Sequence, residues 1–161
     1  MVISGEKWSE VVFIGMERAK VDSKGRIFFP ARFRQLLPDG EVGITLFWDR
    51  CLEVYPGSYL MNILKQLLSL NRADPEIRWF QRYVMSNTQL LNLDGEGRLL
   101  IPQRLREQAG INKEVLIIGT GDHLEIWSPE RYKTGLENFS PESIDASKIP
   151  QELWYKLWGS P

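Results

Sequence analysis

Two stretches of this sequence carry the same charged residues at the same spacing. DSKGRIFFPARFR begins at Asp22, and DGEGRLLIPQRLR begins at Asp94. In each stretch an aspartate precedes an arginine by four residues, and two more arginines follow a proline. Arginine presents its N–H donors in a planar fork that suits phosphate oxygens and the edge of guanine. The aspartate can accept a bond from the arginine and fix its direction. This pattern favours DNA recognition.

Positive charge gathers around the first of these stretches. The whole chain has a formal net charge of −1, which argues against nonspecific coating of nucleic acid. Residues 18–34 nevertheless hold six basic side chains and one acid, a local charge of +5. Residues 94–106 hold three arginines together with Asp94 and Glu96, a local charge of +1. Because Glu96 stands where Lys24 stands in the first stretch, we expect the first stretch to contribute more to binding.

The candidate DNA-contacting residues follow from this pattern. Arg26 and Arg98 occupy equivalent turn positions, and Asp22 and Asp94 are expected to orient them. A structural alternative stays open at each turn, in which the arginine only bonds its aspartate at a corner of the fold. For the arginines that follow the prolines, the alternative is ordinary solvent exposure on a helix. The full predicted set is Lys24, Arg26, Arg32, Arg34, Arg98, Arg104 and Arg106.

Catalytic chemistry finds little support in the sequence. His123 is the only histidine and Cys51 the only cysteine, and no zinc-ligand set or Cys–His dyad is recognisable. Asp22 and Asp94 form a pair of carboxylates, but the arginine four residues later would keep each one ionised and unable to donate a proton. No glycine-rich phosphate loop is present. We therefore expect no enzyme activity, no cofactor and no bound metal.

The two stretches belong to an internal repeat with an offset of 72 residues. This offset aligns Asp22–Pro56 with Asp94–Ser128 without a gap and places apolar residues opposite each other, such as Ile44 and Leu116. Each copy predicts a strand, a glycine turn, a second strand, a helix that begins at a proline, and two more strands. The predicted ranges are 12–21, 26–29, 30–37, 42–47 and 51–55 in the first copy, with 98–101, 115–119 and 124–127 in the second.

Two further helices are predicted between the copies. Residues 59–70 carry leucines at helical spacing, which indicates core packing, and Asp74 and Pro75 mark the start of a second helix. A copy of about fifty residues is too small to bury both faces of its own sheet. The two copies are therefore expected to complete one closed barrel without free edges. The expected fold class is α+β, mainly β with helices.

The expected domain organisation has five parts. They are an N-terminal extension at 1–12, a first repeat with its connecting helix at 13–70, a second connecting helix at 71–84, a second repeat at 85–132 and a C-terminal aromatic tail at 133–161. A short helix is expected from Ser128 and Pro129 onward. The apolar stripe of residues 153–158 has to be buried against the body or a neighbouring subunit. The apolar run VVFI is too short for a signal peptide or membrane span, which favours the cytoplasm.

Four segments of the sequence together resemble a known family. They are the stretches beginning at Asp22 and Asp94, DRCLEVYP at Asp49–Pro56, and GTGDHLEIWSPERY at Gly119–Tyr132. These segments are similar to those of the MraZ family of bacterial transcriptional regulators. The resemblance implies a tandem swapped-hairpin β-barrel like that of AbrB regulators, with connecting helices and a C-terminal helical tail.

The resemblance also carries expectations about partners. It implies a homo-oligomer, in the form of a ring, that binds repeated boxes in double-stranded DNA upstream of its own operon in the division and cell wall gene cluster. The expected location is the cytoplasm in association with the nucleoid, without membrane contact. The competing interpretation is an interaction module of the AbrB or antitoxin-like class that recognises no promoter. Salt-sensitive binding to promoter DNA distinguishes the two interpretations.

Overall fold

The two sequence copies fold into the same succession of strands and helices. A computed structural model describes residues 12–37, 40–46 and 48–159. The predicted N-terminal extension lies outside the described residues except for Val12. The chain divides into two compact units, Met1–Pro129 and Glu130–Pro161.

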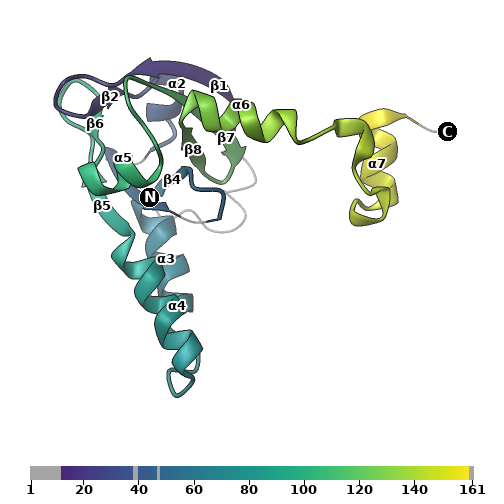
Figure 1. Cartoon of the computed structure of the whole chain (residues 1–161), viewed down its shortest axis with the longest axis horizontal. Coiled ribbons are helices and arrows are strands. Elements are labelled where there is room, and N and C mark those ends of the chain that lie inside the picture. Colours follow the sequence, from purple (N-terminus) through teal and green to yellow (C-terminus); the bar gives the residue numbers. More distant parts are fainter. Residues whose placement is uncertain (1–11, 38–39, 47, 160–161) are drawn as a thin grey trace. The chain divides into compact units, whose positions relative to one another are not determined.

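Within the described residues, each copy contributes four strands and two helices in the same order (Figure 1). The first copy consists of β1 (Phe13–Lys20), β2 (Arg26–Phe28), α2 (Ala31–Arg34), β3 (Glu41–Leu46), β4 (Leu52–Pro56) and α3 (Gly57–Leu68). The second copy consists of β5 (Thr88–Asn92), β6 (Arg98–Leu100), α5 (Gln103–Gln108), β7 (Glu114–Gly121), β8 (Leu124–Trp127) and α6 (Pro129–Glu137). Helix α4 (Pro75–Ser86) connects the two copies.

Prolines mark the starts of the helices that follow the second strands, as the sequence predicts. Pro30 and Pro102 stand immediately before α2 and α5, each with a φ of −55°. The fixed φ of proline suits the start of a helix, and its missing N–H ends the strand ladder. Helix α2 is shorter than the predicted range 30–37, because the chain beyond Arg34 continues in tighter turns that end at Leu37.

Strand exchange between the copies builds the barrel. The six-stranded sheet has the order β1-β7-β8-β4-β3-β5, and every pairing in it is antiparallel. The first strand of each copy therefore pairs with the third strand of the other copy. The second strands, β2 and β6, pair with each other in a separate two-stranded ribbon. This arrangement is the swapped-hairpin barrel that the resemblance implies.

The barrel is not a single ring of paired strands. In the described part of the chain, β1 and β5 are the end strands of the six-stranded sheet and do not pair with each other. The expectation of closure without free edges is therefore wrong for the hydrogen-bond ladder. The β2–β6 ribbon closes the core instead, because Ile27 and Leu99 on its inner side are buried in the barrel.

The third strands are displaced by one residue from the 72-residue alignment. Ile44 of β3 pairs with Val54, whereas Ile126, the counterpart of Val54, pairs with Ile117 of β7. Ile44 therefore corresponds to Ile117 and not to Leu116, and the ungapped alignment is wrong across this strand. The second copy has one more residue before β7 and one fewer in the turn after it. Because side chains alternate along a strand, this shift decides which residues face the core.

Equivalent residues of both copies fill the barrel core. Phe33 of α2 and Leu105 of α5 are buried at matching positions, and Phe13 packs near Phe33 with ring centroids 6.3 Å apart. Burial of an apolar side chain of this size stabilises the fold by about 1.5–3 kcal/mol. The other matched pairs in this core are Ile27 with Leu99, Phe29 with Ile101, Val42 with Val115, Leu52 with Leu124, and Val54 with Ile126.

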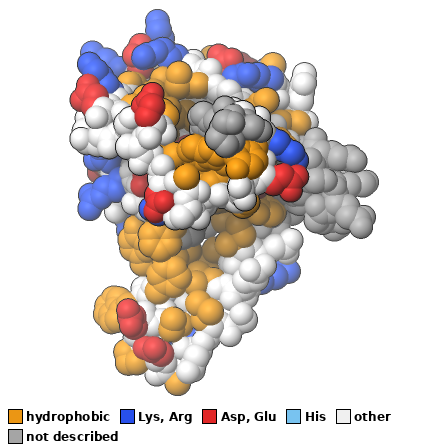
Figure 2. All heavy atoms as spheres, turned by 90° about the vertical axis from the view of Figure 1, so that its right-hand side faces the viewer, with side chains coloured by type: hydrophobic (Ala, Val, Ile, Leu, Met, Phe, Trp, Pro, Cys, Tyr) orange, Lys and Arg blue, Asp and Glu red, His pale blue; other side chains and the backbone are white. Residues whose placement is uncertain are grey.

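Helices α3 and α4 form a hairpin with a second, smaller core. Leu60, Leu64 and Leu67 are buried there with Val84 of α4, which confirms the prediction that the leucine stripe packs inside the protein. Asp74 caps α4 by accepting a hydrogen bond of 2.9 Å from the N–H of Glu76. In the lower part of Figure 2, hydrophobic side chains also gather on the outside of this hairpin.

A polar cluster lies where the copies meet across β4 and β8. Glu53 and Glu125 are directly opposite each other in this strand pair. The Nε2 atom of His123 lies 3.4 Å from Glu53 Oε1 and 3.7 Å from Glu125 Oε2. Its Nδ1 atom lies 2.7 Å from Asp122 Oδ1, and its ring stacks on that of Tyr55. A charged imidazole here offsets the repulsion between two like charges on paired strands.

Folding stability is expected to fall as the pH rises from about 6.5 to about 8. Burial alone would lower the pKa of His123, but the carboxylates of Glu125, Asp122 and Glu53 outweigh it and raise the pKa to about 8. Because this folded value exceeds the unfolded value of about 6.5, protonation stabilises the fold fully below that unfolded value. The stabilisation is lost as the pH passes through the folded value and amounts to about 1–2 kcal/mol.

Thermal melts followed by circular dichroism at a series of pH values test this expectation. The melting temperature should fall on the order of 5 °C across this pH range, and His123→Gln should flatten the curve. A wild-type melting temperature that is constant up to about pH 9 would contradict the role of the imidazolium.

The second unit contains all of α6 except its first residue, together with the predicted tail helix. The tail helix, α7, spans Gln151–Trp158, and two short 3₁₀ turns at Pro141–Ser143 and Ala146–Lys148 precede it. Leu153 and Leu157 are exposed and lie four residues apart on α7. In the described ranges of the chain, none of the helices has the length and apolar character needed to cross a bilayer.

Candidate nucleic-acid interface

The first Asp–Arg turn is held by a network centred on Asp22. Its Oδ1 atom accepts hydrogen bonds of 2.9 Å from the backbone N–H groups of Lys24 and Arg26. Its Oδ2 atom accepts a bond of 2.7 Å from Arg26 Nε. Gly25 closes the turn with a φ of 87°, a value that glycine adopts without steric cost. The carboxylate therefore shapes the turn and aims the arginine.

The second turn repeats this geometry. Asp94 Oδ1 accepts bonds of 2.9 Å from the N–H groups of Glu96 and Arg98, and Oδ2 accepts a bond of 2.7 Å from Arg98 Nε. Hydrogen-bond donors of this kind favour the ionised carboxylate. In the first turn they are led by the N–H of Arg26 and lower the pKa of Asp22 to about 2. The N–H of Arg98 lowers the pKa of Asp94 in the same way. Both carboxylates stay charged at neutral pH.

The β2–β6 ribbon brings the two arginines onto one surface. Arg26 pairs with Leu100, and Phe28 pairs with Arg98, so the four residues alternate along the two strands. The intervening Ile27 and Leu99 point into the core, which leaves the other set on the outer side. Phe28 and Leu100 are 58% and 53% exposed, and the Arg98 guanidinium lies 5.8 Å from the centre of the Phe28 ring. The outer face thus combines two cations with two apolar side chains.

Phe28 and Leu100 lie beside the candidate arginines on the outer face of the ribbon, and the sequence analysis does not predict them as part of the candidate site. Both lie in the short strands that the sequence predicts, at every second position from a buried residue. The alternation within RIFF and RLLI is the signal that could have found them, because side chains two residues apart share a face of a strand. The outer face of the ribbon therefore places exposed apolar side chains next to cationic ones.

The two turns differ in their surrounding charge. Arg98 Nη1 lies 3.4 Å from Glu96 Oε2, so a second carboxylate faces the guanidinium in the second copy. The hydrogen bond that Arg98 Nε donates to Asp94 is the main reason that the pKa of Arg98 is raised, and Glu96 adds to this effect. In the first copy the corresponding residue is Lys24, which is exposed and adds a positive charge. The field around Arg26 is therefore more attractive to an anion than the field around Arg98.

Arg34 and Arg106 lie against the glycine turn of the opposite copy. A Cβ atom added at Gly25 would overlap the guanidinium of Arg106, and one added at Gly97 would overlap that of Arg34. Glycine therefore serves both the positive φ of the turn and the close approach of an arginine. The fold brings one helix arginine of each copy beside the other copy's Asp–Arg turn.

Arg32 and Arg104 contact the start of their own copy instead. Arg32 Nη2 forms an ion pair of 3.1 Å with Glu17 of β1. Arg104 Nη1 donates a hydrogen bond of 2.8 Å to the carbonyl oxygen of Ser86, two residues before β5 begins. These two side chains hold the start of each repeat to its helix.

Comparisons with known proteins agree with the presence of two successive repeats. A family model described as "MraZ protein, putative antitoxin-like" matches residues 12–83 and 84–150. The chain is 39% identical over 142 residues to Transcriptional regulator MraZ of Roseiflexus castenholzii, covering 88% of this chain and 96% of that protein. It is 35% identical over 131 residues to the protein of the same name from Thermomicrobium roseum, covering 81% and 92%.

A solved structure is a weaker match. The solution structure of PHS018 from Pyrococcus horikoshii is 16% identical, with a TM-score of 0.32 over 73% of this chain and 96% of that chain, which is too slight to inform the fold. The family model, in contrast, matches one copy after the other along the two halves that exchange strands in the barrel. On these matches and this architecture, the chain belongs to the MraZ family.

Proposed function

We propose that this protein is a DNA-binding transcriptional regulator that contacts the major groove with its β2–β6 ribbon. The main support is that this two-stranded ribbon presents Arg26 and Arg98 on one face, where the Nε atom of each donates a hydrogen bond to an aspartate. The major groove of B-DNA admits a two-stranded ribbon of this kind. The relatives named as transcriptional regulators support the same function. The proposed site of action is the promoter region of its own operon, which places the protein at the nucleoid.

The proposed contacts divide between bases and phosphates. Arg26 and Arg98 read the edge of guanine, because the aspartate occupies Nε and fixes the direction of the remaining N–H donors. Phe28 and Leu100 contact thymine methyl groups beside them. Lys24, Arg34 and Arg106 contact phosphates around the turns, where they set position and add affinity. Arg32 and Arg104 contribute to the positive field while they hold the fold together.

The DNA-bound form is expected to be a homo-oligomer. One ribbon covers few base edges and phosphates, so a single chain on a single box should bind weakly. Several chains joined together, as in a ring, would place several ribbons on repeated boxes and raise affinity through effective concentration. The exposed Leu153 and Leu157 on α7 support a contact between chains.

The proposed function is tested by titrating the full-length protein against labelled DNA from upstream of its own gene. The control is a scrambled fragment of the same length and composition, and both titrations are repeated over a series of salt concentrations. We expect preferential binding to the upstream fragment and a linear fall of log affinity with log salt concentration. Equal binding to both fragments, or none, would favour the interaction-module interpretation.

Asp22→Asn is expected to weaken binding to the upstream fragment about threefold to tenfold. Asparagine keeps an oxygen for the backbone N–H groups of the turn but loses the negative charge and the second oxygen that hold Arg26 Nε. Arg26 is then present but less well directed, so the loss should be smaller than that of Arg26→Ala. The measurement is a fluorescence anisotropy titration. Wild-type affinity in Asp22→Asn would show that the carboxylate does not orient the arginine.

A further inference from the structure

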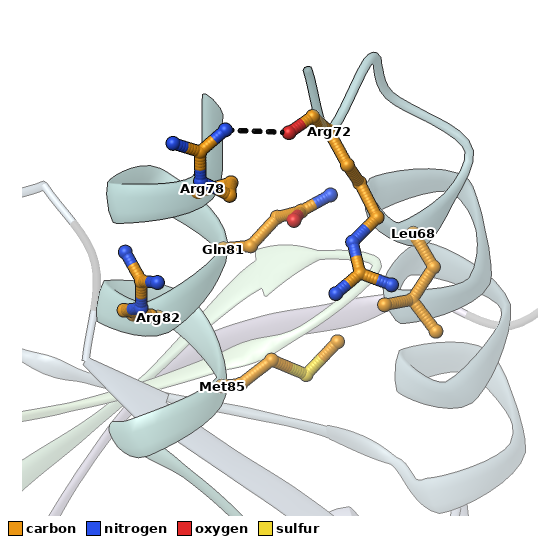
Figure 3. Close-up of a pocket in the computed structure, with 6 residues that line it drawn as sticks. All are labelled: Leu68, Arg72, Arg78, Gln81, Arg82 and Met85. Carbon is orange, nitrogen blue, oxygen red and sulfur yellow. Dashed lines mark hydrogen bonds between the residues drawn. The ribbon is translucent and has the colours of Figure 1, made fainter. Parts of the chain in front are cut away.

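A hollow lined by three arginines lies between α3 and α4 (Figure 3). Its volume is about 240 Å³. In Figure 1 the α3–α4 hairpin extends from the barrel on the side away from β2 and β6, so the hollow is separate from the proposed DNA-contacting face. Leu68 and Arg72 line it from the end of α3 and the turn that follows, and Arg78, Gln81, Arg82 and Met85 line it from α4.

The three arginines of the hollow carry charge that the described residues do not neutralise. No carboxylate of the described ranges lies within ion-pair distance of Arg72, Arg78 or Arg82. The acids nearest to them in sequence are Asp74 and Glu76, and Asp74 Oδ1 accepts a bond from the N–H of Glu76 as the cap of α4. Three positive charges around one hollow create a local field that attracts an anion from solution.

Two of these guanidiniums are held in place by contacts that leave donors available. Arg78 Nη1 donates bonds of 2.9 Å and 3.1 Å to the carbonyl oxygens of Arg72 and Ala73, as Figure 3 shows for the first. The Arg82 guanidinium lies over the Trp79 ring, 4.7 Å from its centre. Stacking uses the face of the guanidinium, so its N–H groups remain free to bond in the plane. Because these side chains are already held in place, less conformational entropy is lost when an anion binds.

We propose that this hollow binds a phosphate group. A phosphate carries more than one negative charge and several acceptor oxygens, so it matches three arginine forks better than a single carboxylate does. Leu68 and Met85 give the hollow an apolar side that suits the carbon part of a phosphate ester. The volume lies below that of a typical pocket for a drug-sized ligand, about 300 Å³ or more, so a small ester fits it best. The phosphate comes from a free ester or from the backbone of a nucleic acid.

Calorimetric titration of the full-length protein with pyrophosphate tests this site. Arg82→Gln is the main variant, because Arg82 is exposed and its described contact is to Trp79 alone. Lys65→Gln removes a charge from exposed α3 outside the hollow and is the matched control. We expect Arg82→Gln to weaken pyrophosphate binding about fivefold or more, with Lys65→Gln at the wild-type value. Thermal melts confirm that each variant is folded.

Two further arms identify the source of the phosphate. If Arg82→Gln loses pyrophosphate binding and keeps its affinity for a duplex without promoter boxes, the ligand is a free ester. If both affinities fall and pyrophosphate competes with the duplex, the ligand is the nucleic-acid backbone. Absence of pyrophosphate binding, or equal binding by wild type and folded Arg82→Gln, would overturn the proposal. Arg26→Ala should bind pyrophosphate normally, so failure at this hollow is distinguishable from failure of the ribbon.

Discussion

Replacement of Arg26 by alanine is expected to weaken binding to each DNA box about tenfold to a hundredfold, and more than replacement of Arg98. The substitution removes a guanidinium whose direction is fixed by a bond of 2.7 Å from its Nε to Asp22. Arg98 has the same bond to Asp94, but it also faces Glu96 at 3.4 Å. DNA has to displace that second carboxylate from the guanidinium, so Arg98 is expected to contribute less to the binding free energy than Arg26.

The loss should grow with the number of boxes on the DNA. When several chains of one oligomer bind one fragment, the losses at the engaged boxes multiply, so Arg26→Ala on multi-box DNA should look nearly all-or-none. The measurement is a titration of Arg26→Ala and Arg98→Ala on fragments with one box and with several boxes. Lys65→Ala, which removes one positive charge far from the ribbon in sequence, is the control for net charge.

Thermal melts separate the DNA-contacting role from the structural alternative. Arg26 is partly exposed, so a folded variant with weakened binding supports a DNA contact. Weakened binding with a collapsed melting temperature would favour the alternative, in which Arg26 holds the turn with Asp22. Equal losses for the two arginines would keep the DNA contact but refute the inequality attributed to Glu96. Unchanged affinity of Arg26→Ala would remove this residue from the interface.

Gly119→Ala is expected to destabilise the fold by about 3 kcal/mol, a large share of the stability of an ordinary folded domain. Gly119 lies on β7, where the second copy receives β1 from the first copy, and it pairs with Gly15. A Cβ atom at this position would overlap the main-chain atoms of Phe13 and Ile14. A main chain in a paired strand cannot rotate away as a side chain can, so the strand pair itself has to shift.

Urea unfolding followed by circular dichroism measures this effect. Gly95→Ala is the matched control, because a Cβ atom at Gly95 meets nothing within 4 Å and its φ is not positive. The control should change the free energy of unfolding by less than about 0.5 kcal/mol. A Gly119→Ala protein with the wild-type midpoint would mean that β1 can separate from β7 without cost, which contradicts the exchanged pairing.

The turns and helix starts at the candidate site can be predicted from the sequence. The spacing of Asp22 and Arg26, with Gly25 between them, predicts a tight turn in which the acid orients the arginine, and the structure has this turn in both copies. Pro30 and Pro102 predict the start of each short helix, and the structure confirms both. These features depend on residues within four positions of each other, so the backbone geometry of a short segment is enough to determine them.

The ungapped 72-residue alignment of the two copies is correct at the turns and wrong across the third strands. Residue types revealed the duplication, but both Leu116 and Ile117 are apolar, so the sequence could not show that Ile117 is the true counterpart of Ile44. Hydrogen bonds to β8 settle the register, since Ile117 pairs with Ile126 as Ile44 pairs with Val54. A shift of one residue exchanges the side chains that face the core with those that face outward. Only the pairing with the neighbouring strand shows which register the chain adopts.

The sequence by itself determined the duplication, the type of each element in a copy, and the two Asp–Arg turns. Only the tertiary structure decided that β2 and β6 pair and carry both arginines on one face, and that Arg34 and Arg106 cross to the opposite copy's turn. The physical reason is the range of the interactions. Turns and helix starts are fixed by backbone sterics and hydrogen bonds between near neighbours. Strand exchange is instead fixed by burial and pairing between residues 43 to 108 positions apart, and such distant pairings compete with others over the whole chain.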